Sequence, residues 1–69
     1  MNKFKVNDVV KSTIENDCFF KIRGVYNDCY DAAFCDKDGN LEGGSIDIWF
    51  DNSLADEGYA VEANFEKVG

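Results

Sequence analysis

The chain has 69 residues, of which 45% are hydrophobic and 14% aromatic, and its formal net charge is −7. This length fits one small domain whose core removes about 60% of the unfolded surface from water, and the aromatic content argues against disorder. No apolar run reaches the ~18 residues of a membrane span, and the first residues lack the apolar core of a signal peptide, so we expect a cytoplasmic protein without membrane contact.

Charge is divided unevenly along the chain. Residues 1–23 carry five basic and three acidic side chains, whereas residues 24–69 carry two basic and eleven acidic ones. The two parts are therefore +2 and −9. An acidic surface repels phosphate backbones and attracts basic partners, so we expect a protein partner with a basic surface and no direct binding to nucleic acid. The alternative is that the charge only maintains solubility.

The residue types needed for catalysis and metal binding are scarce. The chain has no histidine, so a serine or cysteine nucleophile lacks its usual imidazole partner, and a chain this short offers little room for a pocket that would tune a carboxylate pair. Cys18, Cys29 and Cys35 stand eleven and six positions apart, which does not fit a zinc site. We expect reduced thiols, no catalytic residue, no metal and no cofactor, and hence no enzyme.

The first two predicted strands follow Asn and Asp turns. A turn at Asn7-Asp8 leads into a β-branched strand over residues 9–14, and Asn16-Asp17 marks the next loop. Residues 18–26 then alternate with period two. In that pattern Gly24 predicts a bulge or a sharp bend. The alternation predicts one face formed by Phe20, Ile22 and Tyr26 and an opposite face formed by Lys21, Arg23 and Val25.

The third strand is predicted over residues 30–35, with Tyr30, Ala32 and Phe34 on one face, and the turn at residues 36–40 reverses the chain. Residues 36–40 are similar to the first five positions of an EF-hand calcium loop. Leu41, Gly43 and Asp47 then depart from the Gly, aliphatic and Glu positions of that loop, and the flanks predict strands. We interpret the segment as a hairpin turn, with weak calcium binding as the alternative.

The fourth strand, residues 45–51, follows a flexible Gly43-Gly44 pair and has the clearest alternation. Ile46, Ile48 and Phe50 are predicted to face the core, and Asp47, Trp49 and Asp51 to face outward. An exposed tryptophan between acids is the composition of an interface anchor for a basic partner. The alternative is that Trp49 packs on the second side of the sheet or under residues 52–58.

The last predicted elements are short. Residues 52–58 can hold one helical turn, with Ser53 as N-cap and Gly58 as its end. Residues 59–65 alternate as a fifth strand, although the same segment can form a short helix or a 3₁₀ turn before Glu66. We expect residues 1–69 to form a single all-β domain with a minor helical turn: a small five-stranded antiparallel barrel or a strongly bent sheet.

The two ends of the chain resemble the SH3-like small barrels of bacteria and phages. Residues Phe4–Val10 resemble the opening F-K-V-G-D-x-V segment of that family, with Asn7 in place of Gly, and Asn64–Val68 resembles its closing x-F-E-K-V strand. The resemblance implies a fold and supplies no catalytic residues. The small acidic chain is also similar in style to accessory proteins that phages use against host machinery.

These observations predict an acidic, non-enzymatic protein-binding module. In its most specific form this is a phage or bacterial accessory protein that inhibits a basic, nucleic-acid-binding protein as a DNA mimic. The alternative is a structural or assembly subunit that acts as a homo-oligomer, so the expected state is a monomer or a small homo-oligomer. The predicted partner-binding residues are Asp47, Trp49 and Asp51, surrounded by Asp31, Glu42 and Glu62.

Overall fold

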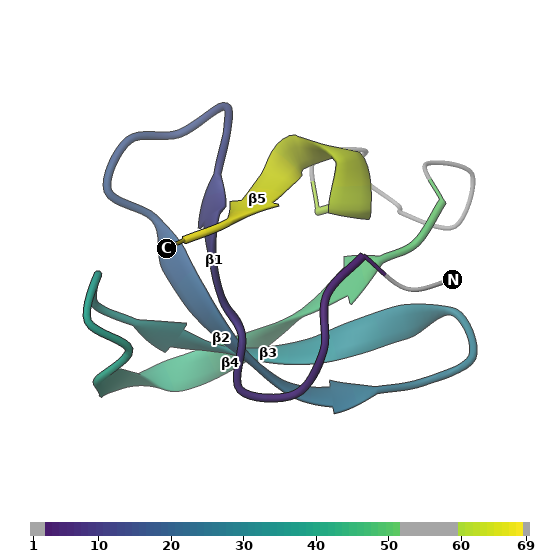
Figure 1. Ribbon diagram of the computed structural model, residues 1–69, viewed down its shortest axis with the longest axis horizontal. Coiled ribbons are helices and arrows are strands. Elements are labelled where there is room, and N and C mark those ends of the chain that lie inside the picture. The colour runs from purple at the N-terminus through teal and green to yellow at the C-terminus, as the bar shows by residue number, and fades with distance from the viewer. Residues whose placement is uncertain (1–2, 52–59, 69) are drawn as a thin grey trace.

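The structure is a computed structural model that describes residues 3–51 and 60–68. Five antiparallel strands form one sheet in the order β4-β3-β2-β1-β5 (Figure 1). The elements are β1 (Val9–Ser12), β2 (Phe19–Val25), β3 (Cys29–Cys35), β4 (Leu41–Trp49), the 3₁₀ helix η2 (Glu62–Asn64) and β5 (Phe65–Lys67). The predicted all-β fold with five antiparallel strands is confirmed, and within the described residues no strand pairing joins β4 to β5 to close the sheet.

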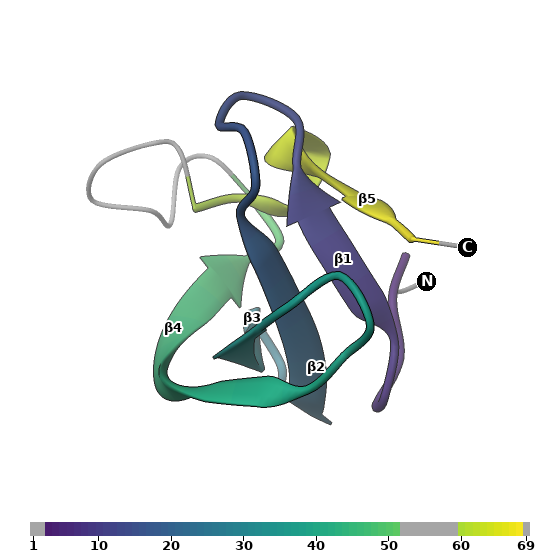
Figure 2. The same ribbon diagram turned by 90° about the vertical axis from the view of Figure 1, so that its left-hand side faces the viewer.

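The core lies between two parts of the sheet. Figures 1 and 2 show β1 and β5 crossing over the layer of β2, β3 and β4. Aromatic rings fill the space between them, with Phe20 and Phe65 at 5.6 Å and Tyr30 and Phe50 at 4.8 Å between ring centroids. The buried core cluster consists of Phe4, Val10, Phe20, Ile22, Tyr30, Ala32, Ile48 and Phe65.

The predicted turn before β1 is confirmed. Asn7 has a φ of 78°, in the left-handed region that Gly adopts most easily and Asn tolerates. The turn also joins the N-terminal segment to β2, because the Asn7 amide donates to the Ile22 carbonyl and the Ile22 amide donates to the Asp8 carbonyl, both at 2.8 Å. The strand is shorter than predicted, since it ends at Ser12 and the Ile14 side chain is 56% exposed.

Gly24 lies in the predicted bulge, and this bulge reverses the faces of the residues that follow it. Ile22 pairs with Ala32, but the next pair is Gly24 with Asp31, so β2 has one extra residue. Val25 therefore lies opposite Tyr30 and packs against the core. The prediction that Tyr26 shares a face with Phe20 and Ile22, and Val25 a face with Lys21 and Arg23, is wrong, because it carried the alternation through the bulge unchanged.

The hairpin turn between β3 and β4 is confirmed. One carboxylate oxygen of Asp36 accepts hydrogen bonds from the Asp38 and Asn40 amides, each at 2.9 Å. Strand β4 begins earlier than predicted and includes Gly43 and Gly44, which were expected to form a flexible linker. Both glycines have positive φ, 90° and 88°, which lets the strand bend while it still pairs with β3.

The C-terminal segment takes the alternative that the sequence left open. Residues 62–64 form the 3₁₀ helix η2, and pairing with β1 starts only at Phe65. For its described part, residues 60–65, the predicted strand is therefore wrong. Val61 and Phe65 are nevertheless both buried, at 5% and 2% exposure. The predicted helical turn over residues 52–58 lies outside the described residues. None of the helices that the structure describes is long and apolar enough to span a bilayer.

Candidate functional site

The outer side of β4 carries the predicted site residues Asp47 and Trp49. Ile48 between them is fully buried, and Ile46 and Phe50 pack partly buried against the core, which confirms the predicted inward face. Asp47 is exposed and lies directly opposite Asp31 of β3. The sheet thus places these two predicted carboxylates side by side on one face.

The Trp49 side chain is half-buried, which is intermediate between the exposed and the packed positions predicted for it. Its amide donates to the Ala60 carbonyl at 2.8 Å, and a parallel bridge joins it to Val61, so this end of β4 contacts the segment before η2. Across the sheet Trp49 lies opposite Cys29. The backbone of Trp49 therefore supports the fold, and its half-buried side chain shares a face with Asp47.

Cys29 is at the centre of an acidic cluster. Its side chain is buried, and this burial, followed by the charges of Asp47, Asp28 and Asp31, raises the pKa of the thiol. The thiol is therefore protonated at neutral pH and is a poor nucleophile. The charges of three carboxylates therefore act on this one thiol, and Asp28 also accepts its hydrogen bond. Sequence reasoning treated Asp28 only as a turn residue, although its place directly before β3 positions it beside this face.

A basic side chain of the same protein already contacts this cluster. The Arg23 guanidinium lies 3.6 Å from a carboxylate oxygen of Asp31, with both side chains partly exposed. An exposed pair of this kind contributes little stability, about 0–1 kcal/mol. Three carboxylates against one guanidinium leave the face with a net negative charge, and no ion pair is recorded for Asp28 or Asp47 within the described chain.

Tyr26 belongs to the same face, which sequence reasoning did not predict. A Cβ atom added at Gly24 would lie 3.2 Å from the Tyr26 hydroxyl oxygen, so the end of this ring lies over Gly24. Gly24 pairs with Asp31, and directly opposed residues share a face. The Tyr26 side chain is 59% exposed. We call the set of Tyr26, Asp28, Asp31, Asp47 and Trp49 the acidic face.

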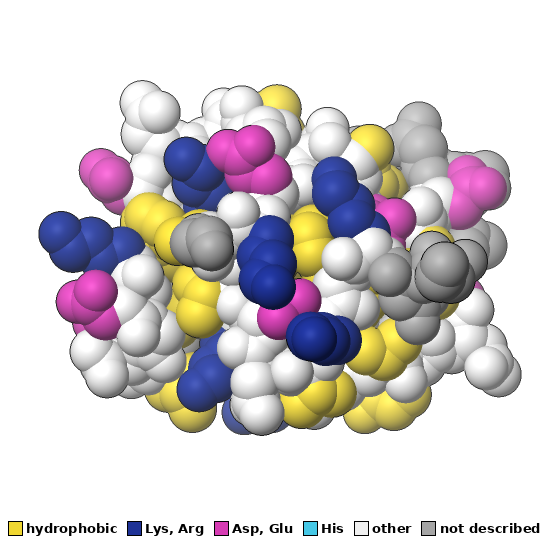
Figure 3. Space-filling view, in the orientation of Figure 1, with side chains coloured by type: hydrophobic (Ala, Val, Ile, Leu, Met, Phe, Trp, Pro, Cys, Tyr) yellow, Lys and Arg dark blue, Asp and Glu magenta, His cyan; other side chains and the backbone are white. Residues whose placement is uncertain are grey.

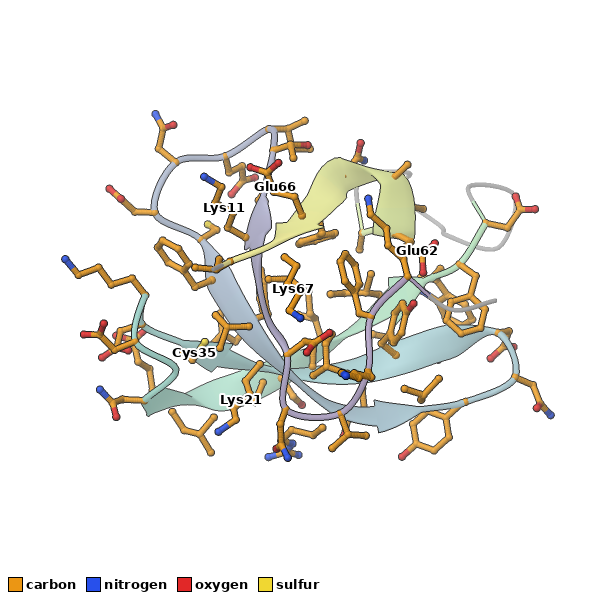
Figure 4. The ribbon with its side chains drawn as sticks, viewed as in Figure 1. Lys11, Lys21, Cys35, Glu62, Glu66 and Lys67 are labelled. Atoms are coloured by element: carbon orange, nitrogen blue, oxygen red, sulfur yellow. The ribbon has the colours of Figure 1, made fainter. Side chains whose placement is uncertain are left out.

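Two of the other three predicted site residues, Glu62 and Glu42, lie away from the acidic face. Glu62 accepts hydrogen bonds from the Tyr30 hydroxyl and from the Lys3 amide, and Figure 4 shows it near the N-terminal segment. Glu42 is exposed at the start of β4, where its charge acts on Cys35 at the opposite end of β3 from Cys29. Asp51 is exposed just beyond the end of β4.

Basic and acidic side chains are interspersed on the face of the molecule seen in Figure 3. Two of the lysines are paired, Lys11 with Glu66 at 3.3 Å and Lys67 with Asp8 at 3.6 Å, and Figure 4 shows both in this orientation. These two lysines on β1 and β5 are thus paired with their own acids, and Arg23 on β2 is the basic side chain that contacts the acidic face.

A surface depression of about 680 Å³ lies around the β1–β2 loop, at the opposite end of β2 from Tyr26. The Cys18 thiol in its lining lies 3.4 Å from a Glu15 carboxylate oxygen. Burial, and then the hydrogen bond to Glu15, raise the pKa of this thiol, so the reactive thiolate is disfavoured. All three cysteines are free thiols.

The turn that resembles a calcium loop uses its carboxylate internally. Hydrogen bonds from Asn40 and from the Asp38 and Gly39 amides lower the pKa of Asp36, so its oxygens already have donors. Among residues 3–51 and 60–68, no group of three acidic or thiol side chains is close enough to hold a metal ion.

Comparisons of the chain with models of protein families, with curated proteins and with solved structures found no match.

Proposed function

We propose that this protein is a small, non-enzymatic binding module whose acidic face docks on a basic surface of another protein. The observation that supports it best is the direct pairing of Asp31 with Asp47, next to the pair formed by the half-buried Trp49 and Cys29, on whose thiol the charge of Asp28 also acts. Carboxylates that lack enough cations in their own chain attract a basic partner at long range. A partly exposed tryptophan supplies the apolar contact area that typical interface anchors provide.

In its most specific form, the proposed role is that of a cytoplasmic phage or bacterial accessory protein that inhibits a nucleic-acid-binding protein. Carboxylates on the acidic face would take the places of phosphates in the partner's groove. The net charge of −7 favours this role over direct contact with nucleic acid. Such binding depends on charge, so it should weaken steeply as salt increases.

The fold that we propose for this role is an SH3-like small barrel. The resemblance of Phe4–Val10 and Asn64–Val68 to that family supports the proposal. The positive φ of Asn7, a position where the family has Gly, also supports it. A further support is the bridge between Trp49 and Val61, which brings the end of β4 toward the C-terminal segment.

A homo-oligomer is the second candidate, because β4 is a nine-residue strand at the edge of the sheet. Edge strands can pair with another chain. Gly43 and Gly44 bend this edge, and Asp47 on β4 would approach a like charge in a pair of copies, so we favour the monomer. Light scattering after size-exclusion chromatography separates the two, since a defined oligomer would support the second candidate.

The acidic face can be tested with matched charge variants. The Asp31→Asn/Asp47→Asn variant removes two charges from the face, and the Asp17→Asn/Asp38→Asn variant removes two from exposed turns elsewhere. Each protein is immobilised and used to capture partners from a bacterial lysate between about 0.05 and 0.5 M salt. We expect the wild type and the Asp17→Asn/Asp38→Asn control to retain basic proteins at low salt. The Asp31→Asn/Asp47→Asn variant should not retain them. Equal capture by all three proteins would refute the proposal.

A further inference from the structure

We propose that the acidic face recognises an arginine side chain of its partner, held between the rings of Tyr26 and Trp49. This inference rests on the proposed function and names the chemistry of the partner group. It follows from the position of Tyr26, which the bulge at Gly24 turns from the core to the outer side of the sheet. The acidic face thereby has an aromatic residue on each side of β3.

The spacing of the two aromatic residues fits a planar cation. The Tyr26 amide donates to the Cys29 carbonyl at 2.8 Å, and Cys29 pairs with Trp49 on the other side. Tyr26 and Trp49 are therefore two strand spacings apart, about 9–10 Å. A cation midway between the two backbone positions is about 5 Å from each strand, so both side chains can bring a ring within the ~6 Å at which cation–π attraction operates. The Cys29 side chain below is only 8% exposed and gives this site a low floor.

The carboxylates are placed to bind the donors of a guanidinium. Asp31 and Asp47 lie opposite each other across β3 and β4, and Asp28 approaches the same floor from the turn before β3. A planar guanidinium can donate to more than one carboxylate while its face stacks on a ring, which a compact ammonium cannot do. Arg23 already brings one guanidinium to within 3.6 Å of Asp31, which shows that this group fits at the edge of the face.

Other ligands fit the face less well. The acidic face lacks a cluster of three acidic or thiol groups that could coordinate a metal ion, as does the rest of the described chain. Nucleic acid would meet carboxylates instead of cations. A lysine ammonium has the right charge but is more strongly hydrated and does not stack. We therefore expect a preference for arginine over lysine that depends on the aromatic rings.

The test uses three capped peptides that alternate glycine with arginine, with lysine or with the neutral isostere citrulline. Each is titrated into the full chain while Trp49 fluorescence and backbone amide chemical shifts are recorded at low salt. The variants are Tyr26→Ala, Tyr26→Phe, which keeps a ring, Asp47→Asn on the face, and Asp38→Asn in the β3–β4 turn as a control. Circular dichroism verifies that each variant is folded.

We expect the arginine peptide to bind about two- to five-fold more tightly than the lysine peptide, and Tyr26→Ala to weaken it by a similar factor. Tyr26→Phe and Asp38→Asn should bind as the wild type, Asp47→Asn should weaken both basic peptides, and the citrulline peptide should not bind. One outcome would overturn the arginine inference alone. In it, Asp47→Asn weakens binding, but the wild type binds the arginine and lysine peptides equally tightly and Tyr26→Ala does the same. The proposed binding role of the acidic face would then stand. If neither basic peptide binds, or Asp47→Asn changes nothing, both proposals fail.

Discussion

Replacing Tyr30 with Phe should destabilise the protein by about 1–3 kcal/mol, the usual cost of leaving a buried polar group without a partner. Tyr30 has no exposed surface, and its hydroxyl accepts a hydrogen bond from the Phe4 amide at 3.1 Å while it donates to Glu62. Phe4 is itself only 3% exposed, so its amide would lose its acceptor in a place that water does not readily reach. Glu62 keeps the Lys3 amide as a donor, so the main cost falls on Phe4.

Urea unfolding followed by the fluorescence of Trp49, the single tryptophan, measures this change. In a domain of this size each kcal/mol also lowers the melting temperature by about 4–8 °C. Tyr26→Phe is the matched control, because it removes the same atom from a side chain that is 59% exposed, and it should change stability by less than about 0.5 kcal/mol. Equal stability of Tyr30→Phe and the control would show that the hydroxyl does not hold the N-terminal segment in place.

Two further predictions concern the same core and the edge of the sheet. Burial, and then the hydrogen bond to Glu62, raise the pKa of Tyr30 from 10.0 to about 12. The stabilising contribution of the protonated Tyr30 hydroxyl is therefore complete below pH 10 and is lost as pH rises toward 12. Over this range the free energy of unfolding, measured by urea titration, should fall by about 2–3 kcal/mol more in the wild type than in Tyr30→Phe. Equal decreases in the two proteins would contradict this prediction. Gly43→Ala and Gly44→Ala should each cost about 1–2 kcal/mol because both residues have positive φ. Gly44→Ala should cost about 1 kcal/mol more than Gly43→Ala. A Cβ atom at Gly44 would lie 3.1 Å from the Phe34 ring, whereas a Cβ atom at Gly43 would have no neighbour within 4 Å. Equal urea midpoints of the two variants would exclude a role for Phe34.

The parts of the fold that the sequence predicted well are those controlled by local chemistry. The turn at Asn7 and the turn at residues 36–40 use residues that bond to their own backbone or tolerate positive φ, so short segments specify them. The strand around Ile48 was equally clear, because its alternation contains no bulge between Ile46 and Trp49. For the same reason the sequence predicted that Asp47 and Trp49 lie on the same face of β4.

The parts that the sequence did not predict depend on contacts between distant segments. Residues 59–65 have the alternation of a strand, but the Asn64 carbonyl accepts a hydrogen bond from the Thr13 amide and the chain turns as a 3₁₀ helix before it pairs with β1. Glu62 was grouped with the acidic residues by charge alone, whereas the buried Tyr30 hydroxyl draws it to another part of the molecule. Pattern and charge do not specify such partners.

The bulge at Gly24 connects the error in the fold prediction to the composition of the site. Without the extra residue, Tyr26 would share a face with Ile22, and Trp49 would be the one aromatic member of the acidic face. With it, Val25 completes the core opposite Tyr30, and an exposed ring lies beside Asp31. Gly24 also leaves open the surface on which that ring lies, because a Cβ there would press against the Tyr26 hydroxyl at 3.2 Å. A single insertion in β2 thus changes an acidic strand into a face with aromatic residues on both sides of its carboxylates, which is the arrangement that favours arginine over other cations.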